Sequence, residues 1–181
     1  MMIPTEYRDY NFPKLDRVRV LGAGPSMEHY QDDGSFSIGV NWVYQRFRVD
    51  LNVATHFVVV HHVWENNDCP GLIYSRQTSD VGGTANNPKA PGIVFDAYRD
   101  LWIGSSTIIT ALHLAGKIAK NVDLFGCDLA LSEDGRMYVP GYLQENRAKP
   151  SNEHFASWAK VIELQIEGIV NVTGMNLTRY K

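Results

Sequence analysis

Glycines and small polar residues that could hold a nucleotide occur in four short segments of the chain. The segments are Gly22-Ala23-Gly24-Pro25-Ser26, Asn41, Gly104-Ser105-Ser106 and Gly126-Cys127-Asp128. Glycine lets the backbone approach a ligand closely, and the amide and hydroxyl groups that follow it can donate hydrogen bonds to phosphate. We expect the four segments to meet and form one pocket for a mononucleotide.

The glycine turn at residues 22–26 differs from the two best-known phosphate-binding glycine motifs. A dinucleotide site needs a third small residue where this chain has Met27, and an acid about twenty positions further on, where it has Asn41. No Gly-Lys-Ser/Thr follows, which excludes a P-loop. The turn, whose last residue Ser26 can cap a helix, therefore indicates a mononucleotide site or a turn that only packs a strand against a helix.

Each of the other three segments also has a structural interpretation. Asn41 offers two donors and an acceptor to a ribose or a base, or it caps the helix predicted to follow it. Ser105 and Ser106 precede an apolar helix, so they bind phosphate oxygens or cap that helix. Asp128 contacts ligand hydroxyls or caps the next turn, and we expect Cys127 to be a small buried residue rather than a nucleophile.

Candidate catalytic residues lie in and after a loop predicted over residues 130–150. Its tyrosines Tyr138 and Tyr142 can stabilise a departing phosphate if the loop closes over a ligand as a lid. His154 lies in the first turn of the helix predicted next, where a histidine can act as a general base near neutral pH. An ordinary solvated loop and a surface histidine are the alternatives.

The composition predicts a soluble globular protein with one core. The chain has 181 residues, of which 44% are hydrophobic and 20% charged. A net charge of -3 does not favour nucleic acid as a partner, and no apolar stretch reaches the roughly 18 residues of a membrane span. The polar residues 1–16 do not resemble a secretory signal. Two distant cysteines predict a reduced, cytoplasmic setting and no metal site.

In the first half of the chain, short apolar segments alternate with turns. Strands are predicted at residues 17–21, 35–40, 71–75 and 92–95, and a further strand begins near Leu51 and extends as far as Val60. A mobile loop is predicted at residues 82–88. In a strand, His61 and His62 would point to opposite faces, which is poor geometry for a shared metal ion; a helix over residues 61–65 is the alternative.

The second half of the chain predicts helix–strand units. Residues 105–120 carry apolar side chains at helical spacing, and residues 121–125 form the next strand. A second amphipathic helix begins at residue 151 or 152 and ends at Gly168, and a last strand covers residues 169–173. The alternation predicts a single three-layer α/β domain with a mainly parallel twisted sheet over residues 17–181, after an N-terminal segment of residues 1–16.

The order of these segments resembles that of a known superfamily. The matching residues are Leu21-Gly22-Ala23-Gly24-Pro25-Ser26, Ile38-Gly39-Val40-Asn41, Gly104-Ser105-Ser106 leading into Ala111-Leu112-His113-Leu114-Ala115-Gly116, and Val122-Asp123-Leu124-Phe125-Gly126-Cys127-Asp128. The superfamily contains bacterial sialyltransferases of the Campylobacter lipooligosaccharide type, motility accessory factors that glycosylate flagellin, and archaeal hydroxymethylpterin pyrophosphokinases. The likeness covers residues 17–173.

The resemblance implies a Rossmann-like domain that binds a nucleotide-activated donor such as CMP-sialic acid and transfers the sugar to a glycan. It implies that the glycine turn and Asn41 hold the nucleotide, and that residues 105–106 and 126–128 contact the donor. It also implies that a lid tyrosine, Tyr138 or Tyr142, stabilises the leaving phosphate, and that a histidine beyond the lid acts as the base, for which His154 is the nearest match. On this resemblance we expect a lid shorter than in those sialyltransferases, without the C-terminal extension that they carry.

Three hypotheses about function follow. The first is a sialyltransferase-like enzyme, whose transfer needs no metal according to the resemblance. The second is a pyrophosphokinase that acts on a pterin-like alcohol and needs magnesium, for which Asp123 and Asp128 are the candidate ligands. The third is a nucleotide-binding protein without catalysis, encoded by a phage or mobile element, which the short lid favours. The sequence leaves self-association open.

Overall fold

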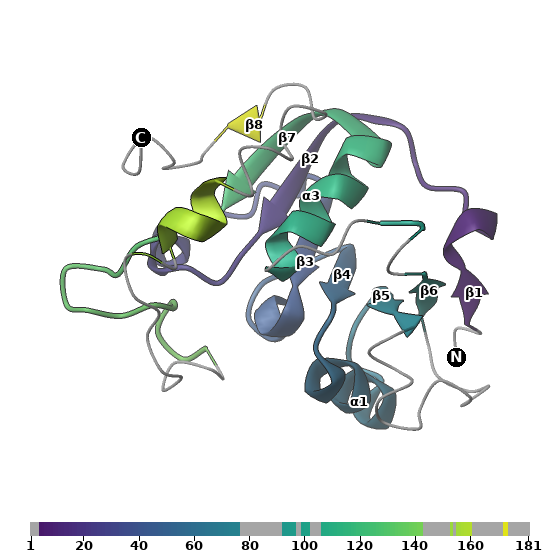
Figure 1. Cartoon of the computed structure of the whole chain (residues 1–181), viewed down its shortest axis with the longest axis horizontal. Helices are drawn as coiled ribbons and strands as arrows, with labels where there is room; N and C mark the ends of the chain where they lie inside the picture. Colours follow the sequence, from purple (N-terminus) through teal and green to yellow (C-terminus); the bar gives the residue numbers. More distant parts are fainter. Residues whose placement is uncertain are drawn as a thin grey trace.

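A parallel sheet forms the centre of the computed structural model (Figure 1). The structure describes residues 4–76, 92–96, 99–101, 106–142, 153, 155–160 and 172–173. Over these residues eight strands pair in the order β1-β6-β5-β4-β3-β2-β7-β8, and every neighbouring pair is parallel. The predicted class, a single Rossmann-like α/β domain with a parallel sheet, is confirmed.

The elements follow the chain in an order close to the predicted one. The strands are β1 (Thr5–Glu6), β2 (Leu15–Leu21), β3 (Ser37–Val40), β4 (Leu51–Ala54), β5 (Leu72–Ser75), β6 (Ile93–Phe95), β7 (Ala119–Phe125) and β8 (Val172–Thr173). The helices whose bounds lie within the described residues include α1 (Phe57–Asn66), α3 (Thr107–Ile118) and the short 3-10 helices η1 (Tyr7–Asp9), η2 (Pro25–His29) and η3 (Asn41–Gln45).

The sheet changes its direction of growth at β2. From β2 the chain adds β3, β4, β5 and β6 on one side, and then returns to add β7 on the other. Crossovers between parallel strands are right-handed, so the connections on the two sides of β2 lie on opposite faces, which gives three layers. In open sheets of this kind, ligands bind outside the carboxyl ends of the strands near the point of reversal. That point lies between β2 and β7.

Helix α3 covers the centre of one face. It packs against β2, β7 and β3, and in Figure 1 it lies in front of these strands. Apolar residues recur along α3 at helical spacing, so it buries Ile109, Leu112 and Ala115. Under it, Val20 of β2 and Leu124 of β7 belong to the same core. The predicted helix over residues 105–120 is therefore confirmed, although it ends at Ile118 and β7 begins at Ala119.

The strand expected to run from Leu51 as far as Val60 is wrong in its second part. Strand β4 ends at Ala54, and α1 begins at Phe57. The β-branched residues favoured a strand by propensity, but Val59, Val60 and Val63 are spaced so that one face of a helix buries all three. Tertiary packing decides between the two structures here.

The histidine pair consequently lies on α1 instead of on a strand. Successive helical residues point about 100° apart, and the two side chains take different partners. Nδ1 of His61 lies 3.2 Å from a carboxylate oxygen of Glu65. Nδ1 of His62 lies 3.0 Å from the hydroxyl of Tyr44.

The N-terminal segment contributes to the same sheet as the rest of the chain. Strand β1 pairs with β6, and Tyr7 of η1 joins the hydrophobic core. Arg8 reaches across to Asp100, whose carboxylate is 4% exposed, and its Nε donates to it over 2.8 Å. These contacts fasten residues 5–8 to the edge of the sheet.

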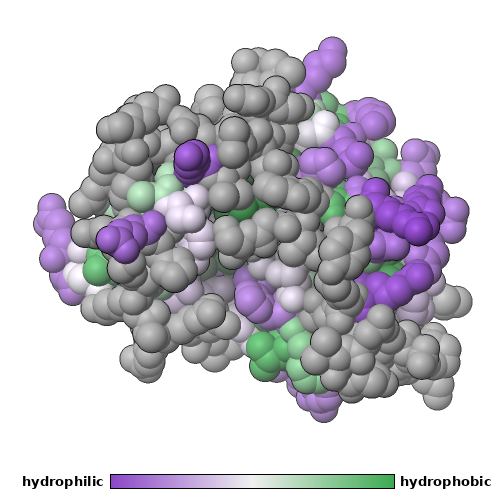
Figure 2. Space-filling view, viewed as in Figure 1, coloured by the Kyte–Doolittle hydropathy of each residue, from purple (hydrophilic) through white to green (hydrophobic). Residues whose placement is uncertain are grey.

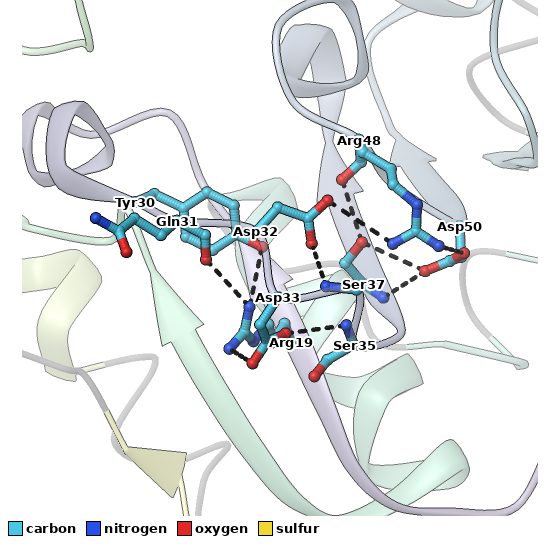
Figure 3. A network of polar contacts seen from close by, with 10 residues as sticks. Arg19, Tyr30, Gln31, Asp32, Asp33, Ser35, Ser37, Arg48 and Asp50 are labelled. Carbon is cyan, nitrogen blue, oxygen red and sulfur yellow. Dashed lines mark hydrogen bonds and ion pairs between the residues drawn. The ribbon is translucent and has the colours of Figure 1, made fainter.

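A polar network fastens the crossover from β2 to β3 (Figure 3). Arg19 of β2 donates to the carboxylate of Asp33 in the connecting loop. The backbone amide of Ser37, the first residue of β3, donates to Asp50 over 2.8 Å, and Arg48 donates to the other oxygen of Asp50. The network fixes the start of β3, and with it the position of Asn41 at the end of that strand.

The surface is mixed on the side shown in Figure 2. Hydrophilic residues gather on the right, over β1 and β6, and a small hydrophobic area lies at the lower edge, over α1. Phe57 and Val58 of α1 are among the exposed large hydrophobic residues. Within the part of the chain that the structure describes, no helix has the length and apolar character needed to cross a bilayer.

Three predicted features lie wholly or partly outside the described residues. The mobile loop at residues 82–88 lies outside them. Of the late helix, residues 153 and 155–160 are described and are helical. Of the last predicted strand, residues 172–173 are described and form β8 beside β7.

Candidate functional site

The carboxyl ends of β2, β3, β4 and β7 lie along one edge of the sheet. The register pairs Leu21 of β2 with Gly39 of β3 on one side and with Phe125 of β7 on the other. Val40 of β3 pairs with Val53 of β4. The glycine turn, Asn41 and the turn after β7 therefore leave the sheet at the same edge, as the strand order requires.

The glycine turn is in close contact with the turn after β7. The amide of Gly22 donates to the carbonyl of Phe125, and that of Gly24 to the carbonyl of Gly126, each over 2.8 Å. A Cβ atom at Gly22 would overlap the Gly126 carbonyl, and one at Gly24 would lie 2.7 Å from the same oxygen. Gly126 itself has φ +64°, in the left-handed region. Close packing of two turns thus accounts for these glycines.

The helix after the glycine turn begins earlier than expected. Pro25 is the first residue of the 3-10 helix η2, and Gly24 occupies the cap position. The prediction that Ser26 caps a helix is wrong, because Ser26 lies inside η2. Proline is suited to the first helical position, since it has no amide hydrogen to satisfy there.

Asp128 occupies the space next to the amides of this turn. The backbone amide of Ser26 donates to Oδ2 of Asp128 over 3.0 Å. The same carboxylate lies where a Cβ at Gly24 would be placed. A carboxylate of the protein therefore sits where the sequence predicted that a ligand phosphate would bind.

Asn41 begins η3 in an unusual backbone conformation. Its φ is +51°, and the cap position belongs to Val40, so the interpretation of Asn41 as a helix cap is wrong. Its Nδ2 donates to Oγ1 of Thr107 over 3.3 Å. Its carbonyl accepts a hydrogen bond of 2.8 Å from Nδ2 of Asn52. These contacts hold the Asn41 amide against the first turn of α3.

Two threonines that the sequence did not single out complete this group. The hydroxyls of Thr55 and Thr107 lie 2.6 Å apart, although Thr55 follows β4 and Thr107 opens α3. We call Asn41, Asn52, Thr55 and Thr107 the Asn–Thr cluster. The sequence analysis did not identify Thr55 as a site residue, because the strand predicted as far as residue 60 placed it inside a strand. In the structure it directly follows the end of β4. Its position just after a buried strand is the signal that was available.

The amino end of α3 adjoins both the cluster and the glycine turn. Thr107 contacts Asn41, and Ile108 lies next to Gly22, 3.4 Å from the place of a Cβ there. Ser106 occupies the cap position of α3, but its side chain makes no capping hydrogen bond. Ser105 lies outside the described residues. Asn41 and the glycine turn thus meet the same helical turn.

The first part of the predicted lid is anchored on the glycine turn. The amide of Val139 donates to the carbonyl of Ala23 over 2.8 Å, and Val139 is fully buried. Tyr142 is 5% exposed and belongs to the core, and its ring centre lies 4.9 Å from that of the half-buried Tyr138. Residues 143–150 and His154 lie outside the described residues.

Cys127, just after β7, is buried. Its side chain is part of the core, and burial raises the pKa of the thiol to about 12. The thiolate is the nucleophilic form of cysteine, so Cys127 is a poor nucleophile near neutral pH. The residue packs as a small apolar side chain.

The two carboxylates that a magnesium-dependent transfer would use have separate partners. Asp123 of β7 forms an ion pair of 2.6 Å with Arg17 of β2, whereas Asp128 accepts from the Ser26 amide. Among the described residues, no three histidine, cysteine, aspartate or glutamate side chains are grouped so as to hold a metal ion. Asp123 and Asp128 as arranged here do not fit a shared magnesium site.

Comparisons with known proteins do not assign the chain to a family. No protein-family model matches it, and no curated protein gives a significant match. The arrangement of residues at the carboxyl edge of the sheet is therefore the basis on which a function can be proposed.

Proposed function

We propose that this chain is a glycosyltransferase-like enzyme that uses a nucleotide-activated sugar of the CMP-sialic acid type. The observation that supports the proposal most is the Asn–Thr cluster at the carboxyl edge of a parallel sheet. Three neighbouring elements, η3, β4 and α3, each supply an amide or hydroxyl there, and Thr55 adds a hydroxyl just after β4. Nucleotides bind at this edge in open α/β sheets, close to the reversal of strand order.

The chemistry of the cluster suits the uncharged part of a nucleotide. Amide and hydroxyl groups both donate and accept hydrogen bonds, as the edge of a cytosine and the hydroxyls of a ribose require. The amino end of α3 adds a partial positive charge beside Thr107, which favours the donor phosphate nearby. The Asn–Thr cluster and the amino end of α3 would thus bind the base, ribose and phosphate of one nucleotide.

The transfer itself is an inverting displacement at the anomeric carbon. His154 accepts the proton of the acceptor hydroxyl while that oxygen bonds to the anomeric carbon. The bond between the anomeric carbon and the phosphate oxygen breaks, and CMP leaves with both electrons. Tyr138 stabilises the developing charge on the phosphate. We assign this role to Tyr138 because Tyr142 is buried in the core.

Magnesium-dependent pyrophosphate transfer has less support. It requires carboxylates that share a metal ion, and Asp123 and Asp128 contact Arg17 and Ser26 instead. The proposed sugar transfer does not need Asp123 or Asp128 as a metal ligand.

A thermal-shift screen tests whether the chain binds a cytidine nucleotide. We expect CMP to raise the melting temperature more than UDP, GDP or ATP, to an equal extent with magnesium or EDTA. Asn41→Gly removes the side-chain amide, and glycine readily adopts the φ of +51° found at this position. It should weaken CMP binding about tenfold, the effect of losing one good hydrogen bond, and Asn66→Ala on α1 should not.

Turnover of CMP-sialic acid tests whether the protein is an enzyme. We expect donor consumption in EDTA, and His154→Gln should lower kcat about 100-fold or more while CMP affinity stays unchanged. Selective stabilisation by ATP with magnesium would point to the pyrophosphokinase instead. If the protein binds CMP but does not consume the donor, the result would support the third hypothesis, a nucleotide-binding protein without catalysis.

A further inference from the structure

We infer that Asp128 decides which part of the donor the glycine turn accepts. Its carboxylate excludes phosphate from the turn and receives hydroxyl groups, so the turn binds the uncharged, hydroxylated part of the ligand. The donor phosphate then lies elsewhere along the carboxyl edge. This inference rests on the proposed function for the identity of the ligand, but its first test does not.

The exclusion of phosphate follows from the contact between Asp128 and the turn. A glycine turn binds phosphate through backbone amides that point at the anion. Here the Ser26 amide already donates to Oδ2 of Asp128, and the Gly24 amide donates to the Gly126 carbonyl. A phosphate would have to displace the Asp128 carboxylate from the Ser26 amide and remain close to its negative charge, which is unfavourable. The amides of Gly22, Gly24 and Ser26 therefore all donate to acceptors of the protein while Asp128 is in place.

The hydroxyl specificity follows from the second oxygen of the same carboxylate. Among the described residues, the bond from Ser26 is the one hydrogen bond that Asp128 makes, and its side chain is only half-buried. An ionised carboxylate has acceptor positions on both oxygens, so Oδ1 can accept from a hydroxyl group. Hydrogen bonds to a charged acceptor are among the strong ones, and the vicinal hydroxyls of the ribose are well suited to make them.

An NMR titration with inorganic phosphate tests the exclusion directly. In the unmodified protein the backbone amide signals of Gly24 and Ser26 should not shift as phosphate is added. In Asp128→Ala both signals should shift, because the carboxylate has been removed and the amide of Ser26 can reach the anion. Asp9→Ala removes the same charge from the exposed end of η1 and should respond as the unmodified protein does.

A comparison of two nucleosides tests the hydroxyl contact. Cytidine should bind the unmodified protein at least about tenfold more tightly than 2',3'-dideoxycytidine. In Asp128→Asn this preference should fall severalfold, because the neutral amide is a weaker acceptor. Asp128→Asn retains a carbonyl oxygen for the Ser26 amide, so its fold, checked by circular dichroism, should be unchanged.

The outcomes separate this inference from the proposed function. Phosphate-induced shifts of Gly24 and Ser26 in the unmodified protein would overturn the inference even if CMP binds. A preference for cytidine that Asp128→Asn leaves intact would overturn it as well. If phosphate shifts those signals in Asp128→Ala alone while no cytidine compound binds, the exclusion stands and the proposed function fails.

Discussion

At the scale of single residues, glycine controls how closely the turns after β2 and β7 approach. Their backbone hydrogen bonds form only because Gly22, Gly24 and Gly126 carry no side chain. This contact also brings Asp128 to the Ser26 amide. The same residues therefore fix both the packing of the turn and the charge that a ligand meets there.

Replacement of Gly22 by alanine should destabilise the fold. The added Cβ would overlap the Gly126 carbonyl, which belongs to the backbone and cannot rotate away. We expect a loss of about 2 to 3 kcal/mol in the free energy of unfolding, measured by urea denaturation. Gly34→Ala is the control, because a Cβ there meets no atom within 4 Å and only the φ of +82° is unfavourable. That variant should lose about 1 kcal/mol. Equal losses would contradict the steric explanation.

At the scale of elements, α3 connects the core to the candidate site. Its buried face packs on β2, β3 and β7, and its first residue, Thr107, contacts both Asn41 and Thr55. The position of the Asn–Thr cluster is therefore set by helix packing. A change in the first turn of α3 should therefore affect stability and ligand binding together.

His113 makes the contribution of α3 to stability depend on pH. Burial, and to a lesser extent the charge of Lys117, lowers the pKa of His113 below its ordinary value of 6.5. Below that pH the unfolded chain takes up a proton that the folded protein does not, so stability falls as the pH decreases. We expect the melting temperature to decline below about pH 6.5, and His113→Gln should reduce that decline.

The position of Lys117 offers a check on this explanation. Lys117→Gln should raise the pKa of His113 part of the way towards its ordinary value, as followed by NMR titration of the imidazole. An unchanged pKa in Lys117→Gln would leave burial as the whole cause. A decline in melting temperature that His113→Gln does not alter would contradict the prediction for α3.

At the scale of the whole molecule, the sheet depends on strands added at its edges. Strand β1 covers β6 on one side, and Tyr7 and Arg8 next to it contact the core and Asp100. An uncovered strand edge carries free backbone groups that can pair with another chain. The N-terminal segment thus protects the sheet as well as extending it.

Deletion of residues 1–10 should lower the melting temperature and promote aggregation. It removes β1 and the Arg8–Asp100 ion pair, and it leaves the β6 edge unpaired. Thermal unfolding and light scattering at increasing protein concentration measure the two effects. Deletion of residues 1–3 leaves every described contact in place and is the control. If the protein without residues 1–10 melts at the same temperature as the full-length protein, β1 is dispensable for stability.

The amino-acid sequence by itself determined the fold class and most of the elements. The apolar runs that became β2, β3, β7 and α3 have clear periods, and a parallel sheet places the turns after such strands at one edge. Local pattern alone was therefore enough to find the glycine turn, Asn41 and Asp128. The functional roles of all the candidate site residues remain predictions, and Ser105 and His154 lie outside the described residues.

Only the tertiary structure decided what these residues contact. Asn41 meets Thr107 across 66 positions, Thr55 meets Thr107 across 52, and Ser26 meets Asp128 across 102. Local pattern does not specify such pairs, because they depend on how helices and strands pack. Packing likewise made residues 57–66 a helix despite their β propensity. Packing also placed the Asp128 carboxylate at the glycine turn, a contact that the sequence of the turn alone does not predict.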